Sequence, residues 1–138
     1  VTWELGLSAR PLPILADRIQ IEQVIVNLIQ NAIDAVRGGR GRAKKIHLQV
    51  TAAKGRAELA VTDTGSGVSA ETAERLFEPF FTTKAQGLGM GLAISRSIIE
   101  AHDGRIWVEH TPEGRRGTTV RFSLPLRAAR PPRKRRSS

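Results

Sequence analysis

The sequence predicts an α/β two-layer sandwich, in which helices pack on one face of a mixed, mainly antiparallel sheet. Two observations support this fold class. In some long segments, apolar residues recur with the period of a helix. In the short segments between them, apolar and polar residues alternate, as in strands. The short segments also come in pairs joined by turn residues, which is typical of antiparallel hairpins. Because helices and hairpins occupy separate stretches of the chain, we expect them to form separate layers.

The first half of the chain holds one long helix between strands. Two prolines in residues 10–13 make a connector, because proline is excluded from helix interiors and from strand ladders. Asp17 is a suitable N-cap for a helix over residues 18–37, and the glycines of residues 38–41 end that helix. The expected strands of this half are residues 1–7, 46–52 and 57–62, of which the last two form a hairpin through Lys54-Gly55-Arg56.

The second half repeats the pattern with shorter helices. Ser69 is expected to cap a helix over residues 70–76, and a loop follows it as far as Gly87. A second main helix is expected over residues 90–101, because its apolar residues keep the helical period as far as Asp103-Gly104. The expected strands of this half are residues 105–110 and 118–124, which pair across a turn at 112–114.

Length and composition indicate one cysteine-free domain without a membrane span. The chain has 138 residues, enough for a single domain with a real core. No apolar run approaches the ~18 residues of a transmembrane helix, and the first residues do not form a signal peptide. The lack of cysteine excludes disulfides, zinc-thiolate sites and a thiol nucleophile, and it fits a reducing cytosol. We therefore expect a cytoplasmic location.

The net charge of +9 is concentrated at the C-terminal end. Residues 127–138 hold six basic residues and no acid, which leaves 16 basic against 13 acidic residues, or +3, on residues 1–126. The sequence therefore predicts a nearly neutral domain over 1–126 and a basic, disordered tail over 127–138. No aromatic residue interleaves the basic ones, so we expect no specific nucleic-acid partner.

The long helix carries a stripe of oxygen-bearing side chains on the side away from its apolar face. An ordinary solvated surface would explain the stripe. Asparagine is a poor residue for a helix interior, however, so two of them one turn apart favour a site that uses neutral oxygens. Mg²⁺ fits such a site, because it takes few protein oxygens and keeps phosphate oxygens and waters as its other ligands. The stripe consists of Gln23, Asn27, Asn31 and Asp34.

A strand that runs into Asp63-Thr64-Gly65-Ser66-Gly67 supplies a second candidate element. A tight turn with a side-chain bond to the backbone would explain the same residues. As chemistry, the Asp63 carboxylate at the end of this strand can accept a hydrogen bond from an exocyclic amine. Gly65 and Gly67 lack a Cβ and let the backbone approach a flat base. Asp63 and these glycines are therefore candidates for contact with a flat base that carries an amine.

A glycine-rich segment before the second main helix is the third element. Backbone amides at a helix N-terminus bind anions, and the helix dipole adds to the attraction. No strand precedes this segment, which argues against a Rossmann motif, and no Gly-Lys-Ser/Thr occurs, which argues against a Walker loop. A phosphate partner and an ordinary solvated lysine remain open for Lys84. The candidate nucleotide contacts here are Thr83, Lys84, Gly87, Leu88, Gly89, Gly91 and Leu92.

In this order, the motifs resemble the catalytic and ATP-binding domain of bacterial sensor histidine kinases, within the gyrase, Hsp90, histidine kinase and MutL (GHKL) superfamily. The resemblance covers about residues 14–126 and implies the Bergerat fold, with ATP and Mg²⁺ as cofactors. It implies that Asn31 binds magnesium with support from Asn27, that Asp63 bonds the adenine amine, and that Thr118 joins the water network beside it. The short segment 82–88 resembles kinases related to nitrogen, oxygen and dicarboxylate sensing.

The resemblance also implies a protein-histidine kinase that donates the γ-phosphate of Mg-ATP to a histidine on a separate dimerisation domain. A response regulator receiver domain would act downstream in two-component signalling. Superfamily members that hydrolyse ATP often carry Glu at the position of Asn27, and Asn cannot accept a proton at neutral pH. This residue therefore favours phosphoryl transfer. The alternatives are a GHKL-type ATPase, an anti-sigma-type serine kinase, or a non-catalytic nucleotide-binding or interaction module.

None of the three histidines fits the phosphoacceptor pattern, which is a histidine followed by an acid within a dimerisation helix. His47 and His110 belong to expected strands, and His102 ends a helix. We therefore expect a monomeric fragment of a longer kinase, with the acceptor histidine elsewhere. Membrane contact, if any, would come through other parts of that kinase.

Overall fold

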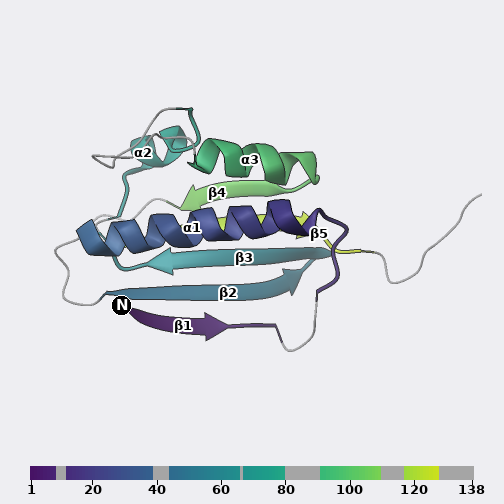
Figure 1. The fold of residues 1–138 in the computed structure, drawn as a ribbon, viewed down its shortest axis with the longest axis horizontal. Helices are drawn as coiled ribbons and strands as arrows, with labels where there is room; N and C mark the ends of the chain where they lie inside the picture. The colour runs from purple at the N-terminus through teal and green to yellow at the C-terminus, as the bar shows by residue number, and fades with distance from the viewer. Residues whose placement is uncertain (9–11, 39–43, 66, 80–90, 110–116, 128–138) are drawn as a thin grey trace, which may run out of the picture.

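A computed structural model describes the protein over residues 1–8, 12–38, 44–65, 67–79, 91–109 and 117–127. Five strands form one sheet in the order β1-β2-β3-β5-β4, and α1 and α3 lie side by side against one of its faces (Figure 1). The elements are β1 (Thr2–Gly6), α1 (Arg18–Gly38), β2 (Lys45–Ala53), β3 (Arg56–Asp63), α2 (Ala70–Arg75), α3 (Gly91–Ala101), β4 (Arg105–Glu109) and β5 (Thr118–Pro125).

The sheet is mixed and mainly antiparallel, so the predicted fold class is confirmed. Only the edge pair β1–β2 runs parallel, and the pairs β2–β3, β3–β5 and β4–β5 are antiparallel. The β2–β3 hairpin turns through Lys54 and Gly55, whose φ angles of 54° and 76° are the positive values that a tight two-residue hairpin uses. Strand β3 lies at the centre of the sheet, so its last residue, Asp63, has a strand on each side, with Ile46 of β2 and Thr118 of β5 opposite it.

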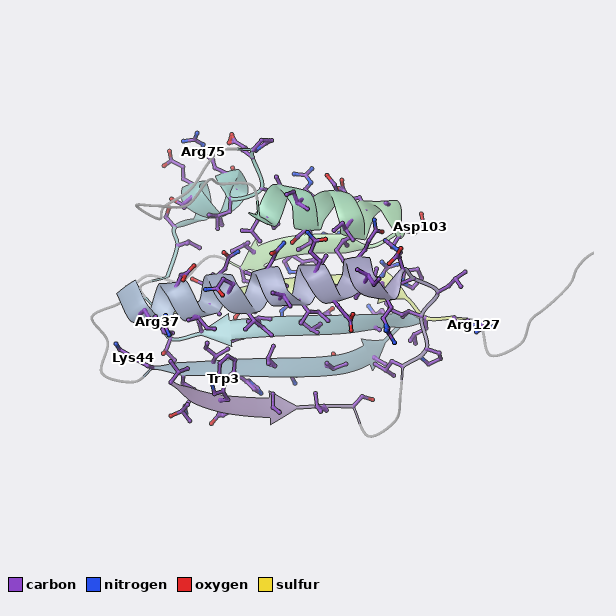
Figure 2. All side chains as sticks on the ribbon, in the orientation of Figure 1. Trp3, Arg37, Lys44, Arg75, Asp103 and Arg127 are labelled. Carbon is purple, nitrogen blue, oxygen red and sulfur yellow. The ribbon has the colours of Figure 1, made fainter. Side chains whose placement is uncertain are left out.

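The helices begin and end on local signals that the sequence carries. The Asp17 carboxylate accepts a hydrogen bond of 3.1 Å from the Gln20 amide, and Ser69 caps α2 in the same way. At the C-terminal end of α3, Asp103 takes a φ of +62° (Figure 2). The Gly104 amide donates to the Ile99 carbonyl at 2.9 Å. This arrangement is a Schellman cap, which directs the chain from α3 back to the sheet.

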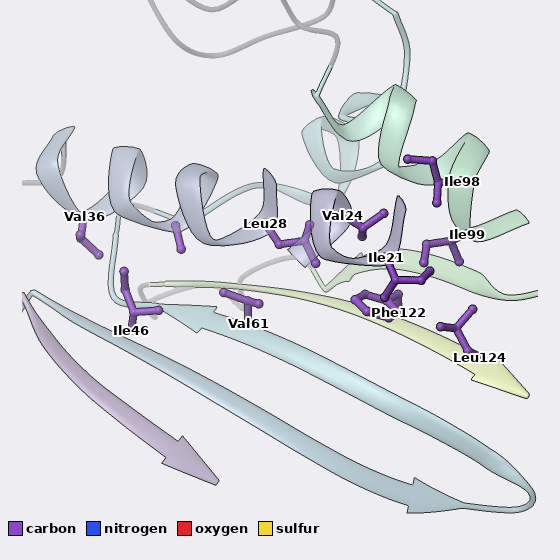
Figure 3. Close-up of a cluster of buried hydrophobic side chains, with 11 residues drawn as sticks. Ile21, Val24, Leu28, Val36, Ile46, Val61, Ile98, Ile99, Phe122 and Leu124 are labelled. Atoms are coloured by element: carbon purple, nitrogen blue, oxygen red, sulfur yellow. The ribbon is translucent and has the colours of Figure 1, made fainter. Parts of the chain in front are cut away.

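The hydrophobic core lies between α1, α3 and the helix-covered face of the sheet (Figure 3). The apolar face expected for the long helix is the face that packs here. From the sheet, alternate residues of β2, β3 and β5 enter the core, as the period of a strand requires, whereas β1 contributes none of the described core residues. The largest buried side chains include Val24, Leu28, Val36, Ile46 and Ile99. No helix within the described residues is both long and apolar enough to span a bilayer.

The other face of the sheet is polar. Arg121 on β5 forms ion pairs with Glu58 at 2.9 Å and with Glu109 at 2.8 Å. Trp107 pairs in register with Arg121 and therefore shares this face, while Trp3 lies on the edge strand β1 and is 46% exposed (Figure 2). Trp107 thus lies on the face opposite α1 and α3, and Trp3 lies on the edge strand farthest from β4, so neither tryptophan lies between the two helices, where the candidate site is.

Candidate functional site

The most buried charged group of the described chain lies where β3 ends. Asp63 is 6% exposed, and its Oδ1 accepts a hydrogen bond of 2.8 Å from the Gly65 amide. The Thr118 amide also donates to this carboxylate. Burial raises the pKa of Asp63, because the charged form loses water, and the two amide bonds lower it in part. A carboxylate held by backbone donors in a partly dry site is a fixed hydrogen-bond acceptor.

Two glycines let the chain close around this carboxylate. The Gly117 amide donates to the Gly65 carbonyl at 2.9 Å, which joins the turn after β3 to the start of β5. Gly117 has a φ of +94°, and a Cβ there would collide with the Asp63 carbonyl oxygen. A Cβ on Gly65 would lie 2.7 Å from the carbonyl oxygen of Ala35 on α1. In this structure Gly65 is therefore required by its packing against α1.

Gly117 and the amide of Thr118 are features of the candidate site that sequence reasoning missed. The resemblance implied that Thr118 joins a water network beside Asp63, and that role stays a prediction. The structure adds that the Thr118 backbone amide donates to the Asp63 carboxylate. The register of β3 and β5 places Thr118 opposite Asp63, so the Thr118 amide reaches the Asp63 carboxylate directly. A glycine immediately before the strand was the available signal, but its φ angle could not be read from the sequence.

Within the oxygen-bearing stripe of α1, Asn27 contacts α3, and only Gln23 is exposed. The Nδ2 of Asn27 donates to the Gly91 carbonyl at 3.5 Å and to Ser95 Oγ at 3.3 Å. Asn31 and Asp34 are half-buried, and Asp34 accepts a bond of 3.2 Å from Gln30. The stripe thus runs from the start of α3 toward the turn after Asp63.

The contact between Gly65 and Ala35 fixes the geometry of the site. Asn31 lies one helical turn before Ala35, and Asn27 lies one turn before that. The last turns of α1 therefore bring the Asp63 turn to the C-terminal end of the stripe, while Asn27, two turns earlier, meets the first turn of α3. One flank of α1 connects a carboxylate suited to a base with amide oxygens suited to a metal ion that carries a phosphate.

The predicted phosphate segment is only partly described. Thr83, Lys84, Gly87, Leu88 and Gly89 lie outside the described residues, so their roles stay predictions. Gly91 is the first residue of α3, and a Cβ there would meet open space. Leu92 packs against the hydrophobic core, and Gly67, with a φ of +84°, continues the turn after Asp63.

The donor set fits a metal that arrives with phosphate. Among the described residues, no group of three His, Cys, Asp or Glu side chains could hold a metal ion alone. Asn27 directs its Nδ2 toward α3, which leaves its Oδ1 as the atom that could face a metal. Weak neutral ligands of this kind suit Mg²⁺, which keeps phosphate oxygens and waters around it.

Comparison with known proteins relates the chain to ATP-binding kinases and ATPases. A family model described as histidine kinase-, DNA gyrase B- and HSP90-like ATPase matches residues 16–128. The chain is 49% identical to the sensor protein FixL of Bradyrhizobium diazoefficiens, over 81% of this chain and 22% of FixL. It is 41% identical to the C4-dicarboxylate transport sensor protein DctS of Rhodobacter capsulatus, over 80% of this chain and 17% of DctS. The chain spans about a fifth of the length of these relatives.

Solved structures agree in fold and in sequence. The nucleotide-free catalytic domain of histidine kinase ThkA is 36% identical with a TM-score of 0.77, and the match covers 91% of this chain and 78% of that one. ThkA in complex with the response regulator protein TrrA matches with 33% identity and a TM-score of 0.73, over 91% of this chain and 34% of that one. The chain therefore belongs to the histidine kinase-, DNA gyrase B- and HSP90-like ATPase family, and it is a catalytic domain of the sensor histidine kinase type.

Proposed function

We propose that this domain binds Mg-ATP and presents the γ-phosphate to a histidine on a separate dimerisation domain. The observation that carries the proposal is the buried Asp63 carboxylate, which backbone amides fix at one end of the polar flank of α1. In a family of ATPases, this carboxylate is the described group best placed to read a base. The same flank offers amide oxygens for the metal at its other end.

Asp63 would accept a hydrogen bond from the adenine amine. The Gly65 and Thr118 amides hold the carboxylate, so it needs little rearrangement when the base arrives. A guanine carbonyl in the same place would put two acceptors against each other, and a buried acceptor without a donor is costly. This difference supports selection of adenine over guanine nucleotides.

Asn31 would hold magnesium through its side-chain oxygen, with Asn27 in support. Phosphoryl transfer depends on positioning and on charge stabilisation more than on covalent chemistry by the protein. The amides before α3, together with Lys84, would bind the phosphates. Asn27 cannot act as a general base for water, and no carboxylate takes its place on this stripe before Asp34, so transfer is favoured over hydrolysis.

The partners we propose are a dimerisation domain that carries the acceptor histidine and, downstream, a response regulator receiver domain. The complex of ThkA with TrrA supports the second partner, since the ThkA catalytic domain has the same fold. A cytoplasmic location follows from the proposal, because ATP and receiver domains are available there.

The test has two steps, binding and transfer. Calorimetry is the suitable method for binding, because Trp3 and Trp107 lie away from the site. The chain should bind ATP more tightly with Mg²⁺ than with EDTA. Mixed with a separate dimerisation domain and γ-labelled ATP, it should label the acceptor histidine, and a His→Ala variant of that domain should stay unlabelled.

Each alternative gives a different result in the same assay. Release of labelled phosphate without labelled protein would favour an ATPase. Label on a serine would favour the serine kinase. Tight ATP binding with neither product, in the presence of a competent dimerisation domain, would leave a non-catalytic binding module and contradict the kinase.

A further inference from the structure

A single hydroxyl group is completely buried in the apolar stripe of α3. Ser95 is 0% exposed and lies three and four residues before Ile98 and Ile99, which belong to the hydrophobic core. Among the described residues, the other buried polar side chains are those of Asp63 and Ser123. A buried hydroxyl needs a hydrogen-bond partner, so the partner of Ser95 indicates what this hydroxyl does.

The partner of Ser95 is the amide of Asn27 on α1. Nδ2 of Asn27 lies 3.3 Å from Ser95 Oγ and 3.5 Å from the carbonyl oxygen of Gly91. Because 3.5 Å is near the limit of a hydrogen bond, the contact with Ser95 is the stronger of the two. The Gly91 carbonyl can only accept, so the atom of Asn27 that faces it must be the nitrogen.

This pair of contacts determines which way the Asn27 amide points. Both acceptors come from the first two turns of α3, and they draw Nδ2 to that side. Oδ1 is then turned away from α3, and it accepts no hydrogen bond within the described part of the chain. A rotated amide would instead place its nitrogen toward the candidate metal site, where a donor repels a cation.

We propose that Ser95 is a positioning residue for magnesium-nucleotide binding, which acts by orienting the Asn27 amide. The inference rests on the function proposed above. It also connects two parts of the site that are 68 residues apart in the chain, since Ser95 lies one turn after Gly91, where the glycine-rich segment enters α3. The side-chain amide of Asn27 thus connects the metal-facing flank of α1 with the first two turns of α3.

The matched variants are Ser95→Ala and Ser97→Ala in the full 138-residue chain. Ser97 is exposed on the same helix, so it controls for the effect of removing a serine hydroxyl from α3. Calorimetric titration of ATP is carried out with Mg²⁺ and with EDTA. Loss of one hydrogen bond of ordinary strength predicts that Ser95→Ala weakens Mg-ATP binding about three- to tenfold. Binding in EDTA should not change, and Ser97→Ala should change neither value.

A double variant separates positioning from a purely structural role. In a chain that already carries Asn27→Ala, Ser95→Ala should cause no further loss of Mg-ATP affinity, because the group it orients is gone. The inference would be overturned if Ser95→Ala lowered the Mg-ATP affinity equally with and without Asn27. It would also be overturned if Ser95→Ala lowered the ATP affinity equally in Mg²⁺ and in EDTA. If the unaltered chain binds no ATP at all, the proposed function itself fails, and this inference fails with it.

A second measurement uses the unaltered chain, and so it stands even if Ser95→Ala does not fold. The side-chain NH₂ protons of Asn27, which donate to α3, should exchange with water more slowly in NMR spectra than those of exposed Gln23. Exchange of Asn27 at the rate of Gln23 would contradict the contact on which the inference depends.

Discussion

The two ends of the candidate site are built in different ways. At the base end, Asp63 is buried, its partners are backbone amides, and glycines allow the backbone to approach closely. At the metal end, the groups are half-buried side-chain amides, and the contacts of Asn27 are 3.3 and 3.5 Å long. The base end is thus part of the sheet, whereas the metal end depends on the relative position of two helices.

This difference shows which steps of binding cost reorganisation. Backbone donors in a sheet are fixed when the protein folds, so the base end is preorganised for a ligand. Side-chain amides on facing helices can rotate, and weak contacts restrain them. We therefore expect recognition of the base to be a property of the folded chain alone, and recognition of the phosphates to need the metal.

The largest effect is expected from Gly117→Ala, which breaks the base end. A Cβ would meet the Asp63 carbonyl, and the residue would keep an unfavourable φ of +94°. Overpacking and backbone strain each cost about 1–3 kcal/mol, so together they predict a loss of about 3 kcal/mol or more in the free energy of unfolding. Denaturant unfolding measures this. Gly91→Ala is the control and should lose little, because its Cβ would enter open space; equal losses would contradict the account.

Asp63→Asn sharpens the comparison at the level of the ligand. The carboxylate loses its charge, and the amide can no longer accept hydrogen bonds with both oxygens. Hydrogen bonds to charged groups are worth about 1.5–3 kcal/mol, which predicts about 10- to 100-fold weaker binding of ATP and of ADP. The loss should be the same in Mg²⁺ and in EDTA. A loss confined to Mg²⁺ in calorimetry would show that Asp63 does not belong to a separate base end.

Asn31→Ala is the complementary change at the metal end. Removal of one metal-bound oxygen should weaken Mg-ATP binding by about tenfold and leave binding in EDTA unchanged. Gln23→Ala, at the exposed start of the same stripe, is the matched control and should have no effect. If ATP binding in EDTA fell as far as binding in Mg²⁺, Asn31 would be a structural residue rather than a metal ligand.

The smallest expected effect is the dependence of stability on pH. Burial raises the pKa of Asp63 above its ordinary value of 3.8, so the folded chain keeps this proton to a higher pH than the unfolded chain does. As pH rises from 3.8 through the raised folded pKa, the contribution of Asp63 to the free energy of unfolding therefore decreases. The stability of the unaltered chain relative to Asp63→Asn should fall in this window and level off above it. If the free energy of unfolding of the unaltered chain, relative to Asp63→Asn, rose with pH, the two amide hydrogen bonds would lower the pKa of Asp63 more than burial raises it.

Local signals predicted most of the fold. The apolar period of α1, the cap at Asp17 and the turn at Lys54–Gly55 each depend on residues within a few positions, and the structure confirms them. Asp63 and Asn31 stood out because their residue types are unusual where they occur. These features can be recognised in the sequence without knowledge of the tertiary structure.

The rest could not be predicted, because it depends on contacts between distant residues. The partners of Asn27 lie 64 and 68 positions away, so the direction of its amide was not accessible from the sequence. Gly117 matters because β5 pairs with β3, and Ser95 matters because α3 packs on α1. In the sequence, Ser95 is only one polar residue within an apolar stripe.

The most direct test of the difference between the two ends removes the metal. ADP and GDP are titrated into the full chain by calorimetry in EDTA, so that the base end must act alone. The account predicts that ADP binds at least about tenfold more tightly than GDP, because only adenine offers a donor to Asp63. Equal affinities in EDTA would contradict it, and discrimination that appears only when Mg²⁺ is added would mean that the base end is not preorganised.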